Sequence, residues 1–310
     1  MAMRKHTLST YPPPPKHPHC PLLSPPLPTL LLLYARMHPP YCSVCINVIR
    51  TVHAYLIPQL LLPVVYGDLL VVYDLKEIRA KSVKKPSKIP PFAILCGIGD
   101  CKAAVFERSF ASSEVFELNY ADYSVKELPN MLESRSYPGL MHTKATIYVF
   151  GGYIDCSYLK KCEKFDQRTA KWTILPDLLT ARRIFTLSLY KNCIYLPPIG
   201  PPETFEVFST ITDRFIVCPY AGNVEIAGRY WVMSVRNEDK IVLIDRTGEI
   251  VGWKPWGSVR VIGKIGEIRP NVSDLCVVRE KYVYWAMLSI GKLGRLDLNS
   301  IDYSIIDVFS

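Results

Sequence analysis

The sequence lacks the patterns that mark most enzymes and membrane proteins. No window of useful length spaces its apolar residues as an amphipathic helix would, so a mainly helical fold is not expected. It contains no nucleophile elbow, metalloprotease helix or phosphate-binding Walker loop. The apolar stretch 54–73 has the length of a membrane span, but it contains Pro58, Pro63, Gly67 and Asp68, each of which is costly in a lone helix within lipid. We therefore expect buried strands in this stretch and no contact with a membrane.

Histidine is scarce, and cysteine is present without a disulfide framework. The 310 residues include six histidines, and ten cysteines are spread from Cys20 to Cys276. In a chain of this length they indicate the reduced thiols of an intracellular protein, and we expect a cytoplasmic location. Cys42 and Cys45 have the spacing of half a zinc site, with His17, His19, Cys20 and His53 as further zinc-type ligands. A second half-site is missing, so two reduced cysteines at a strand edge are favoured, and no metal or other cofactor is predicted.

Proline is concentrated at one end of the chain. Residues 1–40 hold a large share of the 26 prolines, as in YPPPPKHPHCPLLSPPLP. Because proline has no backbone donor, we predict a disordered leader biased to polyproline II over residues 1–43, followed by a folded domain over residues 44–310. The abrupt change also permits a leader that is not genuine coding sequence. The whole chain, with 49% apolar and 21% charged residues, is globular in composition, and its net charge of +9 favours acidic partners.

A sequence pattern recurs along the chain. Taking Phe165 as an anchor, Trp172 follows seven residues later and Pro176 eleven residues later. The same frame fits Leu118, Val125 and Pro129; Phe208, Phe215 and Pro219; Ile244, Val251 and Pro255; and, more weakly, Leu296 with Tyr303 and a copy anchored on Tyr73. Successive anchors are 45, 47, 43, 36 and 52 residues apart. A repeat of this length indicates a modular architecture.

Each copy of the repeat contains hairpin signals. TLSLYKNCIYL and KIVLIDRTGEIVGW each place two apolar runs around a pair of turn residues. About four short strands in each unit, repeated about six times, predict an all-β fold. We expect a β-propeller of about six four-stranded antiparallel blades, because a lone small sheet buries too little apolar area to be stable. The copy at Tyr73 leaves open whether the first blade is complete. In an incomplete ring, a strand within CINVIRTVHAYLI would pair with the last blade.

The segment from Tyr137 to Arg182 resembles a kelch repeat. It contains an apolar strand, the glycine pair Gly151-Gly152, the aromatic Phe165, six intervening residues and Trp172. In the kelch family the glycine pair ends the second strand, where a residue without Cβ allows a tight turn beneath a packed aromatic ring. The resemblance therefore implies a structural role for the pair. A phosphate loop would need a following lysine and hydroxyl residue or a helix, and neither is present.

The other copies depart from the kelch pattern. Pro197-Pro198 and Glu107 stand roughly where a glycine pair would be, and the remaining copies show no equivalent. The sheet pattern survives these departures, but the family's binding residues cannot be transferred one by one.

The resemblance implies a protein-binding role. Kelch propellers mostly bind proteins through loops at the rim and mouth, and arginines often precede the first strand of a blade. By this resemblance Arg135, Arg182 and Arg183 occupy the binding region, and Tyr153 adds an aromatic contact. We expect a non-catalytic protein-interaction scaffold. The BTB domain of many kelch adaptors has no counterpart before residue 60.

The alternative function is a propeller enzyme, oxidase-like or epimerase-like, with a site on the central axis. A copper site of the galactose-oxidase type needs two imidazoles, and only His142 lies in the repeating region, so that site would require the leader to fold back across the mouth. Convergent carboxylates would also favour an enzyme. We expect Glu203, Glu206, Glu225 and Glu238 in loops or at strand edges, where spacing alone does not bring them together.

The stretch Lys76–Lys88 is strongly basic, with six lysines and arginines against Glu77 alone. It could bind phosphates or an acidic protein tail, although a solvated loop between strands is the simpler interpretation. No aromatic residue is interleaved with these charges, as a single-strand nucleic-acid platform would require, so nucleic acid is not an expected partner.

Overall fold

The computed structural model divides the chain into two units, Met1–Pro40 and Tyr41–Ser310. The structure describes residues 61–66, 68–74, 79–99, 101–183, 187–196, 204–219, 230–234, 241–245, 249–264, 275–279, 282–287, 292–301 and 303–307, all in the second unit. The predicted leader, the zinc-type ligands from His17 to His53 and the proposed closing strand within residues 45–57 lie outside the described residues.

Every regular element in the described ranges is a β-strand, and the strands form six consecutive antiparallel sheets and one separate two-stranded hairpin. The first sheet contains β1 (Leu61–Tyr66), β2 (Leu69–Asp74) and β3 (Arg79–Lys84). The second contains β4 (Ala93–Gly99), β5 (Lys102–Glu107), β6 (Val115–Asn119) and β7 (Ser124–Leu128). The third contains β8 (Gly139–Thr143), β9 (Thr146–Phe150), β12 (Cys162–Asp166) and β13 (Lys171–Leu175).

The remaining strands continue the same arrangement. The fourth sheet contains β14 (Ser188–Tyr190), β15 (Cys193–Leu196), β16 (Thr204–Ser209) and β17 (Arg214–Pro219). The fifth contains β18 (Tyr230–Ser234), β19 (Ile241–Asp245), β20 (Glu249–Trp253) and β21 (Val259–Lys264). The sixth contains β22 (Leu275–Arg279), β23 (Tyr282–Met287), β24 (Lys292–Asp297) and β25 (Tyr303–Asp307). A two-stranded hairpin, β10 (Tyr153–Ile154) and β11 (Ser157–Tyr158), joins β9 to β12.

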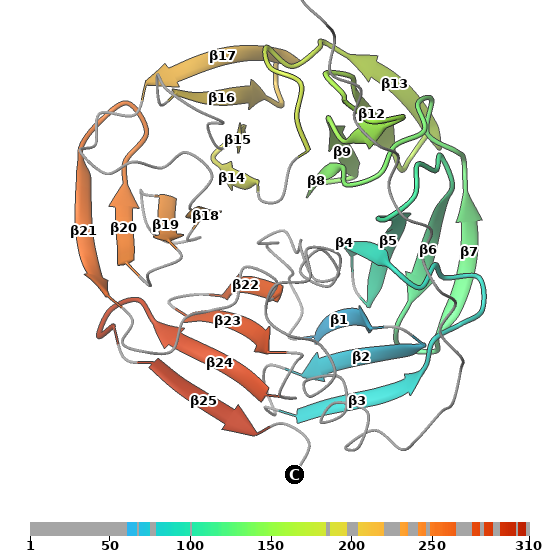
Figure 1. Cartoon of the computed structure of the whole chain (residues 1–310), viewed down its shortest axis with the longest axis horizontal. Coiled ribbons are helices and arrows are strands. Elements are labelled where there is room, and N and C mark those ends of the chain that lie inside the picture. The colour runs from blue at the N-terminus through green and yellow to red at the C-terminus, as the bar shows by residue number, and fades with distance from the viewer. Residues whose placement is uncertain are drawn as a thin grey trace, which may run out of the picture. The chain divides into compact units, whose positions relative to one another are not determined.

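Within the second unit the sheets follow one another around a common centre (Figure 1). In each four-stranded sheet the first strand lies innermost and the fourth outermost, so that neighbouring strands in the sequence are also neighbours in space. This is the predicted all-β propeller with antiparallel blades, and the fold class is confirmed. The described part of the first sheet has three strands, and the sixth sheet is built from four consecutive strands of its own.

The core lies between the sheets because apolar residues alternate along the strands. On β5, Ala104 and Phe106 belong to a cluster shared with the third sheet, whereas Ala103 and Val105 belong to a cluster shared with the first. Successive side chains of a strand point to opposite faces, so a strand that is apolar at every position can bury both faces. Each sheet therefore depends on its neighbours for burial, as the repeat predicted.

The seven-residue spacing of the in-phase copies has a simple origin in the two outermost strands of a sheet. Phe165 on β12 lies directly opposite Trp172 on β13, and their ring centroids are 5.0 Å apart. The other in-phase copies make the same cross-strand pairing: Leu118 with Val125, Phe208 with Phe215, Leu296 with Tyr303, and Tyr73 with Ala80. The repeat thus marks a hairpin whose two strands pack as facing residues.

One copy of the predicted repeat is out of phase. Ile244 lies on β19, the second strand of the fifth sheet, and its cross-strand partner is Ile250 rather than Val251. Val251 on the third strand β20 is the residue that packs against the fourth sheet. With Val251 as anchor, the spacings become 45, 47, 43, 43 and 45 residues, which removes the irregularity seen in the sequence.

The recurring prolines stand where outer strands end. Pro129 and Pro176 directly follow β7 and β13, and Pro219 is the last residue of β17. Proline cannot donate to a ladder, so at these positions it stops the outer strand before the chain crosses to the next sheet. Pro255 belongs to the out-of-phase copy and lies instead in the turn between β20 and β21.

The apolar stretch 54–73 forms strands wherever the structure describes it. Residues 61–66 and 69–73 lie in β1 and β2, and Leu70, Val72 and Tyr73 are buried. The described residues contain no helix with the length and hydropathy to cross a bilayer. The expectation of buried strands in this stretch is confirmed for the described positions.

Candidate interaction surface

The glycine pair lies where two chain connections meet the third sheet. Gly151 and Gly152 follow β9 with φ of +56° and +115°, conformations that favour glycine. A Cβ on Gly151 would clash with the carbonyl oxygen of Arg182, and one on Gly152 would lie 2.8 Å from the carbonyl oxygen of Ser136. The backbone N–H of Gly152 donates to the Arg182 carbonyl at 2.9 Å. The pair therefore permits close packing between the connections that enter and leave the third sheet.

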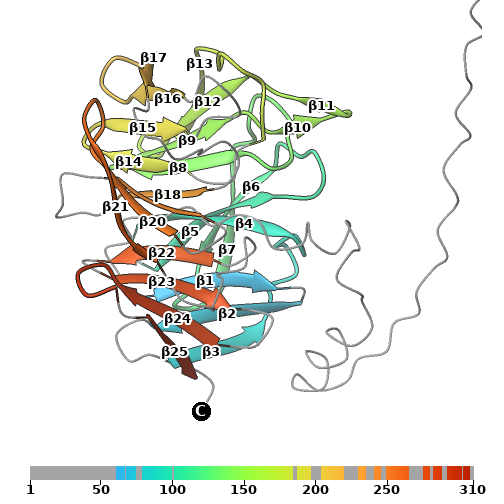
Figure 2. The same cartoon turned by 60° about the vertical axis from the view of Figure 1, so that its left-hand side comes forward.

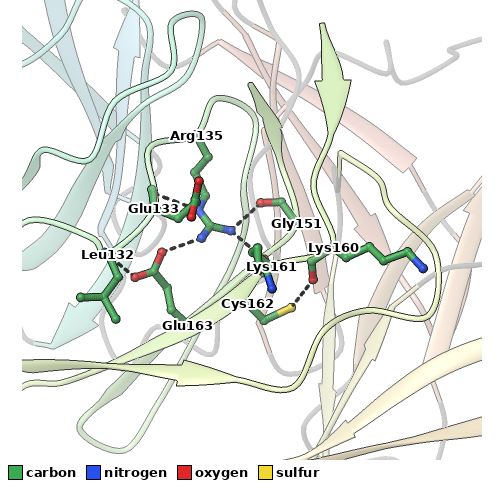
Figure 3. A network of polar contacts seen from close by, with 8 residues as sticks. All are labelled: Leu132, Glu133, Arg135, Gly151, Lys160, Lys161, Cys162 and Glu163. Atoms are coloured by element: carbon green, nitrogen blue, oxygen red, sulfur yellow. Dashed lines mark hydrogen bonds and ion pairs between the residues drawn. The ribbon is translucent and has the colours of Figure 1, made fainter. Parts of the chain in front are cut away.

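Arg135 fixes the connection between the second and third sheets from inside the molecule (Figure 3). Its side chain is 1% exposed and forms an ion pair with Glu163 on β12, with 2.6 Å between Nη2 and Oε1. Its Nη1 also donates to the carbonyl oxygens of Gly151 and Lys161, at 2.7 Å each. The other oxygen of Glu163 accepts the backbone N–H of Leu132 at 2.7 Å. The buried charges are thus paired and bonded on several sides, as burial requires.

The same arrangement of a buried ion pair and backbone hydrogen bonds recurs one sheet further along the chain. Arg182 forms a buried ion pair with Glu206 on β16, and the carboxylate of Glu206 also accepts the backbone N–H groups of Leu179 and Thr180. Burial lowers the pKa of Arg182, and the neighbouring Glu206 opposes this shift. Each carboxylate stands two residues before the anchor of its own copy, Phe165 or Phe208. Each arginine stands seventeen residues after the anchor of the copy before.

These positions correct part of the sequence-based site. Arg135 and Arg182 were predicted to meet a partner at the surface, but both guanidinium groups lie in the interior and are paired there with Glu163 and Glu206. Glu206 was expected in a loop or at a strand edge and is instead a buried residue of β16. Sequence spacing relative to the anchors could have revealed both pairs. Partner binding by Arg183 and Tyr153, which are half-buried, stays a prediction.

Backbone hydrogen bonds join the loops on one side of the second and third sheets into a continuous surface. Ser112 and Arg135 exchange two such bonds, Ser136 and Tyr153 exchange two more, and Arg182 donates to the carbonyl of Leu159. We call this surface the loop face and define it as residues 108–114, 129–138, 151–161 and 176–183. The hairpin β10–β11 projects from it (Figure 2).

The loop face exposes large apolar side chains. The exposed fractions are 68% for Phe110, 56% for Leu132, 52% for Tyr158 and 55% for Leu179. Leu132 and Leu179 hold equivalent places in the two connections, because their backbone N–H groups bond Glu163 and Glu206 in the same way. Single exposed apolar residues are ordinary in proteins, but Leu132 and Leu179 recur at equivalent positions of joined loops.

Comparison with known proteins agrees with this geometry. Residues 134–179, which run from the connection before the third sheet to the start of the one after it, match a family model described as Kelch motif. This segment is a kelch repeat. A solved kelch propeller, "Structure of YjhT", is similar in fold, with a TM-score of 0.55 at 10% sequence identity over 68% of this chain and 82% of that chain. No curated protein matches the sequence.

Aromatic and cationic groups surround the kelch glycine pair on the loop face. The guanidinium carbons of Arg108 and Arg183 lie 5.7 Å and 5.9 Å from the ring centroid of Tyr137. The rings of Tyr153 and Tyr158 lie 5.5 Å apart across the hairpin. A hydrogen bond with Cys156, burial and the nearby Cys156 and Tyr158 raise the pKa of Tyr153, while Arg183 opposes them. At neutral pH this group therefore presents tyrosine hydroxyls beside positive charge.

Other predicted site residues lie apart from the loop face. His142 on β8 is bonded to Gln167 at 2.9 Å, and burial lowers the pKa of its imidazole. Among the described residues no three histidine, cysteine or acidic side chains converge as metal ligands. Cys156, Cys162, Cys193 and Cys218 are free thiols. Burial raises the pKa of Cys162, below the glycine pair, to about 12.

Proposed function

We propose that this chain is a non-catalytic protein-interaction scaffold of the cytoplasm whose partner docks on the loop face. The observation that supports this most directly is the exposure of Phe110, Leu132, Tyr158 and Leu179 on loops that are hydrogen-bonded to one another. Aromatic and large apolar groups, held on a rigid frame, are the usual energetic centre of a protein interface. Kelch propellers as a family use such loops for binding proteins, which agrees with this proposal.

The buried carboxylates of this region argue for a structural rather than a catalytic role. Glu163 and Glu206 are each held by an arginine and by backbone N–H groups, so their negative charge is already satisfied. A general base needs a free lone pair directed at a substrate. The arrangement supports a scaffold whose ionisable groups hold loops in place.

The partner surface proposed here is acidic and partly apolar. Arg183 and the exposed Lys160 belong to the loop face, which also contains the exposed Glu114, Asp155 and Asp177, and the whole chain has a net charge of +9. The net charge of the chain attracts an acidic partner during encounter, while the apolar centre supplies affinity. We assign Leu132, Tyr158 and Leu179 as the residues that make the central contacts with the partner. Arg183 and Tyr153 contact it at the edge of the loop face.

The double variant Leu132→Asp/Leu179→Asp tests this proposal. Because both side chains are exposed, the fold should persist while the apolar centre of the surface is lost. We expect partners captured by the wild-type chain to bind about tenfold more weakly or to be lost. The readout is quantitative affinity capture, with the melting temperature recorded for each variant.

The matched control is Ile211→Asp, at an exposed apolar position in the turn between β16 and β17, away from the loop face. It should keep the wild-type partners. Equal partner lists for the double variant and the wild type would refute docking on the loop face.

A further inference from the structure

The outer strand of the first sheet carries an unusual concentration of positive charge. β3 has the sequence RAKSVK, with Arg79, Lys81 and Lys84 exposed and no carboxylate in the strand. The outer strand β7 of the next sheet, by contrast, combines Lys126 with Glu127. In the described part of the chain neither Arg79 nor Lys84 forms an ion pair, although Asp74 lies opposite Arg79. These cations are therefore available to an outside anion.

The charges of β3 lie on both faces of its sheet. Val83 packs with the apolar cluster shared by the first and second sheets, and Lys81 lies over the ring of Tyr123, with its Nζ 5.5 Å from the centroid. Because side chains alternate, Arg79 and Lys81 share this face, while Ser82 and Lys84 point to the other. A partner lying along the strand edge would meet cations above and below it.

The backbone of β3 also has an outward row of hydrogen-bonding groups. β3 pairs with β2, and no other described strand pairs with it. The N–H of Lys85 donates to the carbonyl oxygen of Asp68 at 2.8 Å. In an antiparallel pair, residues whose backbone groups face the partner strand alternate with residues whose groups face away. Counting back from Lys85, the N–H groups of Val83 and Lys81 face β2, and those of Lys84 and Ser82 face away from it.

We propose that β3 is a second binding site, which takes an extended acidic protein segment as an added strand. The outward N–H and C=O groups of Ser82 and Lys84 pair with the backbone of that segment, and its carboxylates meet Arg79, Lys81 and Lys84. Charge complementarity selects this occupant. Lysines on an edge strand disfavour pairing with a second copy of the same strand, because like charges would lie opposite each other. Nucleic acid could use the charges but has no strand backbone for the edge.

The experiment uses the full chain and a fluorescein-labelled peptide of alternating glutamate and threonine, followed by fluorescence anisotropy. We expect binding that weakens as salt is raised, because exposed charges are screened. Lys81→Glu/Lys84→Glu should weaken binding about tenfold or more, since two attractions become repulsions. Arg260→Glu/Lys264→Glu, on the outer strand β21, is the matched control and should leave binding unchanged. A lysine–threonine peptide should not bind.

A backbone variant separates strand addition from attraction by charge alone. Ser82→Pro removes an outward N–H without removing a bond to β2, a position at which an edge strand accepts proline. It should weaken the peptide while leaving the melting temperature near that of the wild type. Hydrogen exchange on the wild-type chain gives an independent readout, because only an added strand should slow exchange at the amides of Ser82 and Lys84.

The outcomes distinguish an acidic added strand from other possible ligands of β3, and distinguish this site from the loop face. The proposal is overturned if the peptide gives no protection at Ser82 and Lys84, or if a single-stranded oligonucleotide or an anionic phosphatidylserine vesicle binds β3 as tightly as the peptide. Association of the chain with itself through β3 would also overturn it. The Leu132→Asp/Leu179→Asp variant should bind the peptide normally, so that failure of this inference and failure of the loop face can be told apart.

Discussion

Glu163 shows how one side chain can hold two segments of the chain together. One of its oxygens binds the Arg135 guanidinium, and the other accepts the backbone N–H of Leu132. Both partners come from the connection that enters the third sheet, while Glu163 itself lies on that sheet. The fold of the connection therefore depends on a charge that is nowhere in contact with solvent.

Glu163→Gln should strongly destabilise the protein. The substitution keeps the size of the side chain but leaves the buried Arg135 charge without its counterion, and breaking such a pair costs about 3–5 kcal/mol. The free energy of unfolding from urea denaturation measures the effect. Glu127→Gln is the control, because it removes an exposed pair with Lys88 and should leave the urea midpoint nearly unchanged. Similar urea midpoints for the two variants would contradict a stabilising role for the buried pair of Arg135 and Glu163.

At the scale of the element, the hairpin of third and fourth strands is the unit that the sequence repeats. Phe165 and Trp172 pack across this hairpin, and Nε1 of Trp172 donates at 2.7 Å to the carbonyl oxygen of Pro129, at the end of the second sheet's outer strand. The tryptophan therefore stabilises its own hairpin and also joins it to the preceding sheet.

Trp172→Phe should separate these two contributions. The ring contact with Phe165 is largely kept, whereas the hydrogen bond to Pro129 is lost, and we expect a loss of about 1 kcal/mol in the free energy of unfolding. Trp172→Ala should lose considerably more, because the ring contact disappears as well. Urea denaturation of both variants provides the comparison. No loss from Trp172→Phe would mean that the bond between the sheets is not significant, whereas equal losses from the two variants would mean that the ring contact is not.

The sequence predicted the elements well where the repeat was strong and less well where it was weak. The seven-residue spacing between Phe165 and Trp172 could be read from the repeat, and the kelch resemblance implied the turn at Gly151-Gly152, but the pairing of the two rings across the hairpin was not predicted. Ile244 was placed on the wrong strand of its sheet, because alternating apolar strands offer several residues that fit one frame. The burial of Arg135 could not be foreseen without Glu163, its partner 28 residues away.

For the whole molecule, the important property is that both faces of a sheet are interior. On β16, Phe208 belongs to the cluster with the third sheet and Phe205 to the cluster with the fifth. Phe205 stacks on Trp253 with a centroid distance of 4.3 Å, and Phe208 makes an edge contact with Phe150 at 5.4 Å. We therefore expect the described sheets to unfold as a group rather than as separate units.

Phe205→Ala and Phe208→Ala should each destabilise the protein by about 3–5 kcal/mol, because each opens a cavity in a different contact between sheets. Ile216→Ala, at an exposed position on the neighbouring strand β17, should change the free energy of unfolding by less than about 1 kcal/mol. Chemical denaturation with two probes tests whether a single transition is retained. A large effect from only one of the two phenylalanines would show that one face of the sheet is not part of the core.

The loops of the proposed binding face are attached chiefly through main-chain atoms and through buried arginines, not through the side chains they display. Positions such as Phe110, Leu132 and Tyr158 can therefore diverge during evolution while the architecture beneath them persists. Homologous chains could acquire new binding preferences by changing a few such positions. In the same way, the face is a natural starting point for grafting a chosen recognition motif.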